Sequence, residues 1–266
     1  MKKLFLVIVL YLSILPLFSC NNEKEVEKIT TSTYENIEKI NIHSIESNIS
    51  ISQNNKLADD TYIITTNQEC EISFEDNILK IKKNTNSIKI TISYNSNTTL
   101  NDFSLDTYAS SIYSNKIKFN SFNIKSKNIS SFIISNSEFN DLIVLSGNIN
   151  YTSINNNTIN NFNINMDNSF TFEIQNNKFN NLRINSTNCV IHFHKNQFNN
   201  FEYKTIKGSL YMSLSYNLGY TLDLDAKKLE TCPELFSIEN KRYLYKNGDS
   251  YANISSNYGI VSIWFN

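Results

Sequence analysis

The segment Phe139-Asn140-Asp141-Leu142-Ile143-Val144 is one copy of a phrase that occurs six times between Leu100 and Tyr203. Every copy has the form apolar, Asn, polar, apolar, any residue, apolar. The copies begin at residues 100, 119, 139, 159, 179 and 198, so the spacings are 19, 20, 20, 20 and 19. A nearly constant period of this length is typical of a solenoid, in which each repeat stacks on its neighbours.

Between the phrases, apolar and polar residues alternate, as in Phe170-Thr171-Phe172-Glu173-Ile174-Gln175. This period of two is typical of half-buried β-strands. A repeat of about 20 residues has room for two or three short strands with bends between them, and stacked strands lie ~4.8 Å apart. The sequence therefore predicts an all-β fold, a single-stranded parallel β-solenoid (β-helix).

The first and fourth residues of each phrase are apolar in all six copies, so we expect them to point into the core. They are Leu100, Phe103, Phe119, Phe122, Phe139, Leu142, Ile159, Phe162, Phe179, Leu182, Phe198 and Phe201. Burial of each such side chain stabilises the fold by roughly 1.5–3 kcal/mol. Ordering the backbone costs roughly 1–2 kcal/mol per residue. One coil alone cannot offset this cost, so stacking is obligatory.

Asparagine is expected to make the bends, because the chain has only five Gly and two Pro. Candidate bends are Asn155–Asn157, Asn176–Asn177, Asn180–Asn181 and Asn199–Asn200. Asn tolerates the left-handed backbone region better than other non-glycine residues. Equivalent Asn side chains in successive coils can also form hydrogen-bonded ladders. The alternative is a disordered, low-complexity Asn-rich segment, which would not keep Phe and Ile in register.

The N-terminus has the features of a secretory signal: Met1-Lys2-Lys3, then the apolar run Leu4–Phe18, then Ser19 and Cys20. Leu17 to Cys20 resembles the lipobox of bacterial lipoproteins, which implies that Cys20 carries lipid. The alternatives are an ordinary signal peptide or an uncleaved anchor. The expected organisation is a lipoprotein signal peptide over residues 1–19, a lipidated Cys and flexible tether over 20–36, and the β-solenoid domain over 37–266.

Less regular strand patterns flank the repeats and are expected to cap the solenoid at both ends. Ile40-Asn41-Ile42 and Ile88-Lys89-Ile90-Thr91-Ile92 alternate before the first phrase. After the last phrase, Lys227–Phe236 is expected to form a helical turn or loop. The final strand, Tyr258–Phe265, is expected to close the far end.

These features together resemble the bacterial putative-adhesin domain of unknown function and its relative, the head-GIN domain. The residues that carry the resemblance are Asn77-Ile78-Leu79-Lys80-Ile81 near the start, the repeated coils, and Gly248-Asp249 followed by Tyr258–Ile263. The likeness extends from about Ile37 to Phe265, although Asn stands where the family normally has Gly. The resemblance implies a β-solenoid on the cell surface or in the envelope.

Charge and cysteine content restrict the function. The formal net charge is −1 and no basic stripe runs through the coils, so nucleic acid is not expected as a partner. No cofactor is expected. Besides Cys20 the chain has Cys70, Cys189 and Cys232. Cys189 is expected to face inward beside Phe170 of the preceding coil, and the pairing of Cys189 with Cys232 stays open.

Two clusters could carry chemistry. His192 and His194 share a strand face, and the register places Glu173 beside His192 in the neighbouring coil, so these three are the weak candidates for a transition-metal site. The favoured interpretation is an outward polar face without metal. Asp223 and Asp225 are the closest acidic pair, and we expect them to be solvated rather than to work as a glycosidase pair.

Exposed tyrosines, some of them at polar positions of the alternation, could stack on sugars, although aromatic residues are also common in ordinary β-structure. They are Tyr108, Tyr113, Tyr151, Tyr211, Tyr216 and Tyr220.

The leading functional hypothesis is a lipid-anchored, exported, non-catalytic protein, a surface adhesin or an envelope binding module. Its partners would be the membrane, through the N-terminal lipid, and a surface glycan or protein. Alternatives are a structural envelope lipoprotein without a dedicated ligand, which could self-associate, and a glycan-active β-helix enzyme. The sequence does not distinguish the cell surface from the periplasmic face.

Overall fold

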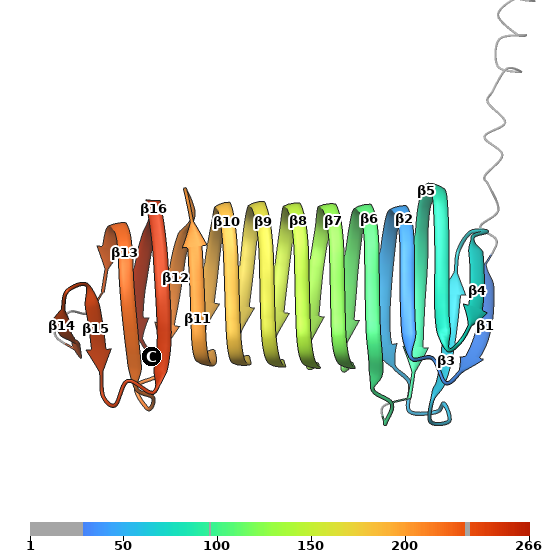
Figure 1. Cartoon of the computed structure of the whole chain (residues 1–266), viewed down its shortest axis with the longest axis horizontal. Helices are drawn as coiled ribbons and strands as arrows, with labels where there is room; N and C mark the ends of the chain where they lie inside the picture. The colour runs from blue at the N-terminus through green and yellow to red at the C-terminus, as the bar shows by residue number, and fades with distance from the viewer. Residues whose placement is uncertain (1–28, 96, 232–234) are drawn as a thin grey trace, which may run out of the picture.

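The computed structural model describes residues 29–95, 97–231 and 235–266, and there the chain forms β-strands stacked side by side in one long body (Figure 1). The order along the body is β1-β3-β5-β2-β6-β7-β8-β9-β10-β11-β16-β13-β15-β14, with β12 on β10 and β16 and β4 on β5. The strands are β1 (Thr30–Glu35), β2 (Lys39–Gln53), β3 (Thr61–Thr66), β4 (Glu71–Glu75), β5 (Ile78–Tyr94), β6 (Leu100–Asn115), β7 (Lys118–Ser135), β8 (Glu138–Asn155), β9 (Thr158–Gln175), β10 (Lys178–His194), β11 (Gln197–Thr205), β12 (Ser209–Leu214), β13 (Tyr220–Glu230), β14 (Ser237–Glu239), β15 (Arg242–Tyr245) and β16 (Ser250–Phe265).

The prediction of a parallel β-solenoid is confirmed. The central strands β6 to β10 pair in parallel, each with the next, and the repeated phrases face one another. Phe139, for example, pairs with Phe119 on one side and with Ile159 on the other. The expectation of two or three short strands per coil is wrong, because β7, β8 and β9 are each one continuous strand of 18 residues.

Corners within each long strand allow it to wrap around the core. In the β9 coil the inward side chains are Ile159, Phe162, Ile164, Met166, Ser169, Phe172, Ile174 and Asn177. Between some of these inward residues the alternation is interrupted by two successive outward residues, as at Asn160–Asn161, Asp167–Asn168, Phe170–Thr171 and Gln175–Asn176. Each outward pair turns the chain, because strict alternation would keep it on one flat face. The pairing with the preceding coil skips one residue at these corners, as at Asn160, Asp167 and Phe170, and resumes at the next residue.

The twelve side chains expected in the core are all buried, each at most 4% exposed. Aromatic rings at equivalent positions lie over one another along the axis. Phe103 and Phe122 have centroids 4.5 Å apart and planes 10° apart, and Phe119 stacks on Phe139 at 6.1 Å. Stacked rings add to the area burial of each coil, so the core stabilises neighbouring coils jointly.

The tight turn between coils uses a residue with left-handed backbone geometry. Asn136, Asn156 and Asn176 have φ angles of 52°, 58° and 56°, and Lys116 and Lys195 occupy the equivalent places. The expectation for Asn156 and Asn176 is thus confirmed. The two other Asn pairs, 180–181 and 199–200, are outward corners within strands β10 and β11 and have no left-handed backbone.

A ladder of buried asparagines runs along the inside of these turns. Asn157, Asn177 and Asn196 are at most 2% exposed, and Ser137 takes the same position one coil earlier. The backbone N–H of Asn157 donates to Oδ1 of Asn177 (2.8 Å), and that of Asn177 donates to Oδ1 of Asn196 (2.9 Å). Nδ2 of Asn177 donates to the carbonyl oxygen of Ile154 (2.8 Å). The ladder satisfies backbone groups that the turn leaves without strand partners.

Strands at both ends depart from sequence order. At the N-terminal end β2 lies between β5 and β6, while β1, β3 and β4 add antiparallel strands that cover the end. β1 lies inside the stretch expected to be tether. At the C-terminal end β16 lies between β11 and β13, and β15 and β14 extend β13 (Figure 1). Caps at both ends are therefore confirmed.

Two details of the C-terminal prediction are wrong. The final strand does not close the far end, because β16 is an interior coil with parallel partners on both sides. Residues Lys227–Glu230 are not a helical turn, since they belong to β13. The first error arises from assuming that coils stack in the order in which they occur in the sequence.

The insertion of β16 brings two glycines into close contact, and this leads to a prediction. A Cβ atom on Gly259 would overlap the carbonyl oxygen of Gly208. We expect Gly259→Ala to destabilise the protein by about 1–3 kcal/mol, because backbone must shift to accept the methyl group. Urea denaturation measures this, with exposed Asn257→Ala as the control. Equal stability of the two variants would contradict the close approach.

Candidate functional site

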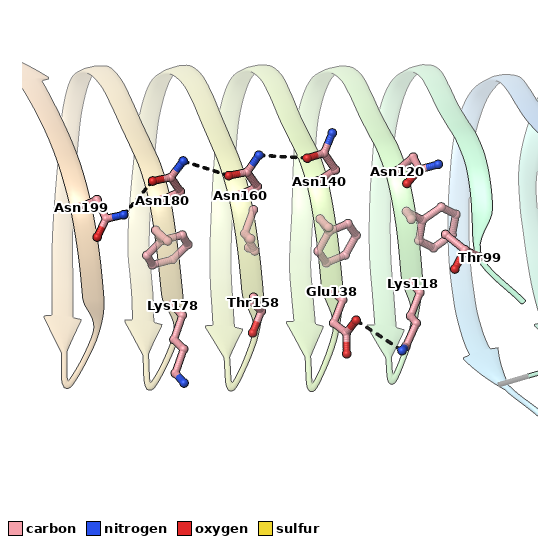
Figure 2. Close-up of a pocket in the computed structure, with 14 residues that line it drawn as sticks. Thr99, Lys118, Asn120, Glu138, Asn140, Thr158, Asn160, Lys178, Asn180 and Asn199 are labelled. Carbon is pink, nitrogen blue, oxygen red and sulfur yellow. Dashed lines mark hydrogen bonds and ion pairs between the residues drawn. The ribbon is translucent and has the colours of Figure 1, made fainter. Parts of the chain in front are cut away.

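A groove with a volume of about 610 Å³ runs along one side of the solenoid (Figure 2). It exists because the coils are in register. The residues before and after the first residue of each phrase therefore line up from coil to coil as two parallel rows. The lining residues are Thr99, Lys118, Phe119, Asn120, Glu138, Phe139, Asn140, Thr158, Ile159, Asn160, Lys178, Phe179, Asn180 and Asn199.

One wall is the outer asparagine row, the second residue of each phrase: Asn101, Asn120, Asn140, Asn160, Asn180 and Asn199. Nδ2 of Asn160 donates to Oδ1 of Asn140 (2.9 Å), that of Asn180 to Asn160 (3.0 Å) and that of Asn199 to Asn180 (2.8 Å). Nδ2 of Asn120 donates to Oδ1 of Asn101 (2.8 Å). The row is interrupted at Asn140, whose Nδ2 donates to Asp141 instead.

The opposite wall is the mixed row, the residue that precedes each phrase: Thr99, Lys118, Glu138, Thr158 and Lys178. Lys118 and Glu138 form an ion pair with 3.3 Å between Nζ and Oε2. Figure 2 shows this pair on the wall facing the asparagines. The pair partly neutralises this wall, which also carries the hydroxyl groups of Thr99 and Thr158 and the charge of Lys178.

The floor consists of the first phrase residues, Phe119, Phe139, Ile159 and Phe179. Their side chains point into the core and are only 1–4% exposed. The groove therefore has a narrow hydrocarbon floor between two polar walls, and its length follows the solenoid axis. Such an arrangement can hold an extended chain in contact with several coils, but it offers no enclosed chamber for a small molecule.

The weak metal candidates lie together without forming a metal site. His192 pairs in register with Glu173, as expected, and the rings of His192 and His194 have centroids 6.0 Å apart. Each histidine packs against an aromatic ring instead, His192 against Tyr211 (5.3 Å) and His194 against Trp264 (5.5 Å). Among the described residues no three His, Cys, Asp or Glu side chains could hold a metal ion together.

The packing of His194 predicts a pH dependence of stability. Burial lowers the pKa of His194, the neighbouring His192 lowers it further, and Glu173 opposes both. The unfolded chain therefore binds a proton at higher pH than the folded chain does, so stability decreases as pH falls below the ordinary histidine pKa of ~6.5. We expect His194→Gln to reduce this decrease between about pH 7 and pH 5, measured by thermal melts. Gln175→Ala, a non-titrating neighbour, should retain the wild-type dependence.

Asp223 and Asp225 do not form an acid–base pair. Asp223 accepts hydrogen bonds from Nε and Nη2 of Arg242 (2.7 and 3.0 Å) and from the hydroxyl of Tyr251 (2.8 Å). The Arg242 hydrogen bond lowers the pKa of Asp223. Asp225 pairs with Lys241 at 2.7 Å. Each carboxylate thus has its own cation, which links β13 to the capping strands.

The tyrosines proposed to stack on sugars lie in different environments. The prediction is wrong for Tyr220, which is fully buried and whose hydroxyl oxygen accepts a hydrogen bond from the backbone N–H of Ser215. Tyr211 is partly buried against His192. The more exposed members are Tyr108, Tyr113, Tyr151 and Tyr216. The most exposed aromatic side chain among the described residues, Phe170 (79%), was not predicted.

Cys189 is buried, as expected, but it pairs with Ser169 rather than with Phe170. The 19-residue spacing is accommodated by a register shift between Cys189 and Ile191, after the cysteine. Cys189 and Cys70 are free thiols. Cys20 and Cys232 lie outside the described residues, as does the expected signal peptide. In the described part of the chain no helix is long and apolar enough to cross a membrane.

The groove was not predicted from the sequence, although the asparagines that form one of its walls recur there. All six phrases have Asn in second position, and the interpretation assigned several of these residues to bends. Only the parallel register shows that these asparagines line up from coil to coil, opposite the mixed row on the other side of the first phrase residue.

Comparisons with known proteins identify similar structures at low identity. No protein-family model and no curated protein matches the chain. Solved structures that match include a putative cell adhesion protein from Clostridium sporogenes ATCC 15579 (11% identity, TM-score 0.28, 90% of this chain and 99% of that chain). Others are putative adhesins from Bacteroides fragilis NCTC 9343 (14%, 0.40, 90% and 98%) and Parabacteroides merdae ATCC 43184 (13%, 0.37, 90% and 96%). All three structures are named as putative adhesion proteins or adhesins.

Proposed function

We propose that the protein is a non-catalytic binding protein of the bacterial cell surface, an adhesin-like module. The observation that supports this most directly is the groove, which offers hydrogen-bonding groups over several coils. Repetition produces an extended contact surface. A long, open groove of this kind suits an extended ligand better than a small substrate.

The side chains of the groove and of the acidic pair argue for binding rather than catalysis. The one acid lining the groove, Glu138, is paired with Lys118. Asp223 and Asp225 are each paired with a separate cation. Glycoside hydrolysis requires two carboxylates on opposite sides of one bond, with one of them able to donate a proton. None of these carboxylates is arranged for that role.

Export and lipid anchoring at Cys20 are part of the same proposal and rest on the pattern of Met1 to Cys20. A lipid at the N-terminus would hold the solenoid at the membrane. The alternative of a structural protein that polymerises end to end is less well supported, because antiparallel strands cover both ends of the solenoid. Covered ends leave less opportunity for strand addition by a second copy.

Protease treatment of intact and permeabilised cells tests this proposal, with a periplasmic protein as control. We expect cleavage of the solenoid on intact cells, and we expect metabolic labelling with palmitate to depend on Cys20. Protection until permeabilisation would contradict surface display. Adhesion of the cells to immobilised glycans and matrix proteins, compared with cells lacking the protein, then tests the binding role.

A further inference from the structure

We infer that the groove binds an extended, uncharged glycan chain whose long axis follows the solenoid axis. This inference rests on the proposed function and names its ligand. The chemistry of the two walls, the charge of the groove and the spacing of the coils each point to this ligand.

The outer asparagine row retains unused hydrogen-bonding capacity. A side-chain amide has two N–H donors and two acceptor lone pairs. In the ladder, Nδ2 of Asn180 uses one donor on Asn160, whose Oδ1 thereby uses one lone pair. The second donor and the second lone pair of each amide remain for a ligand. The row thus presents donors and acceptors alternately, and sugar hydroxyl groups both donate and accept.

The ladder also holds the amides in position before any ligand arrives. Asn160 is bonded to the coil on each side, through Asn140 and Asn180. Fixing a free side chain on binding costs about 0.5–1.5 kcal/mol. Side chains that are already ordered avoid much of this cost, so a polar surface row can contribute to affinity although it is exposed.

The remaining groove surface fits a neutral ligand. The opposite wall has the Thr158 hydroxyl and the Lys118–Glu138 ion pair. A polyanion would require a row of unpaired cations, whereas Lys118 pairs with Glu138 and Lys178 is the one other cation of the lining. Phe139 and Phe179 at the floor are each 4% exposed, so they offer only a narrow strip of hydrocarbon to the C–H groups of a pyranose ring.

Coil spacing favours a glycan over a peptide. Equivalent wall atoms repeat every ~4.8 Å along the axis, which is close to the advance of one pyranose unit in an extended chain. The backbone groups of an extended peptide repeat on one side every two residues, or ~6.6 Å. A peptide in this groove would lose register with the amides after one coil, whereas a glycan would stay aligned over several.

Titration calorimetry with the purified full chain tests the inference. The probes are linear neutral hexasaccharides of glucose, mannose, xylose and N-acetylglucosamine, with a hexamer of galacturonic acid and an extended 12-residue peptide for comparison. We expect at least one neutral hexasaccharide to bind, and Asn160→Ala with Asn180→Ala to weaken that binding at least about tenfold, as loss of two or more hydrogen bonds would do.

The matched control is Asn148→Ala with Asn168→Ala. These residues form an exposed ladder of the same kind in neighbouring coils, away from the groove, with Nδ2 of Asn168 donating to Asn148 at 3.0 Å. The control should bind like wild type, and both double variants should melt at similar temperatures. Equal loss in both variants would overturn the assignment of the groove.

The outcomes separate this inference from the proposed function. Tighter binding of the charged hexamer or of the peptide, or no binding of any neutral hexasaccharide, would overturn the ligand class and leave surface display intact. Cells that adhere through the protein equally well with the groove variant would also overturn it. Protection of the solenoid on intact cells would instead contradict the proposed function, whatever the groove binds.

Discussion

Phe162→Asp is expected to abolish the cooperative unfolding transition of the solenoid. Phe162 is 1% exposed and stacks on Phe179. Loss of a buried phenyl ring costs about 3–5 kcal/mol, and a buried carboxylate without a partner adds several kcal/mol. Whole domains are stable by only about 5–15 kcal/mol. Thermal melts followed by circular dichroism should therefore lose their sigmoidal transition.

Phe170→Asp is the matched control, because the same chemical change is made in the same coil at a side chain that is 79% exposed. We expect its stability to lie within about 0.5 kcal/mol of wild type. Retention of a cooperative melt in Phe162→Asp would contradict the inward assignment of that residue. Since β9 packs between β8 and β10, unfolding of this coil removes a neighbour from both halves of the stack.

Asn177→Ala is the second large effect, with an expected loss of about 3–5 kcal/mol. The amide of Asn177 accepts from the backbone N–H of Asn157 and donates to the carbonyl oxygens of Ile154 and Gln175. Each buried group left without a partner costs about 1–3 kcal/mol. Urea denaturation, with unchanged m-value, measures the loss.

Two comparisons make this result specific to the buried ladder. Asn168→Ala removes an exposed ladder amide, and its cost should stay within about 0.5 kcal/mol. Asn177→Ser should recover part of the stability, because Ser137 occupies the equivalent position and its hydroxyl accepts from the backbone N–H of Ile117. Equal stability of Asn177→Ala and Asn168→Ala would show that the turn does not depend on the buried amides.

The fold was predictable because its signal is repeated. Phrases such as those at Phe139 and Ile159 keep the same inward positions in every coil, and each copy confirms the others. The prediction of several short strands per coil failed because the strands bend at corners without ending. It also failed at a feature that occurs once. The shortened coil containing Cys189 could place its missing residue before or after the cysteine, and only the register with Ser169 shows which.

The candidate site was less predictable than the fold. The sequence showed that Asn140, Asn160 and Asn180 recur, but an exposed ladder and a turn both favour asparagine. Likewise, the sequence predicts Asn157 and Asn177 as bend residues, and nothing in their local sequence indicates that their amides are buried. Local propensity describes the backbone each residue tolerates, whereas burial depends on the coils stacked on either side.

By itself, the sequence determined the strand period, the length of the coil, the inward apolar positions and the need for neighbours. These follow from local alternation and from the small burial available to one coil. Tertiary structure alone decided the insertion of β2 and β16 into the stack, the burial of the asparagine ladder and the two walls of the groove. The physical reason is that these features depend on which strands pair. Strands pair through backbone hydrogen bonds, and nearly all residue types offer the same backbone groups, so the local sequence does not identify the partner strand.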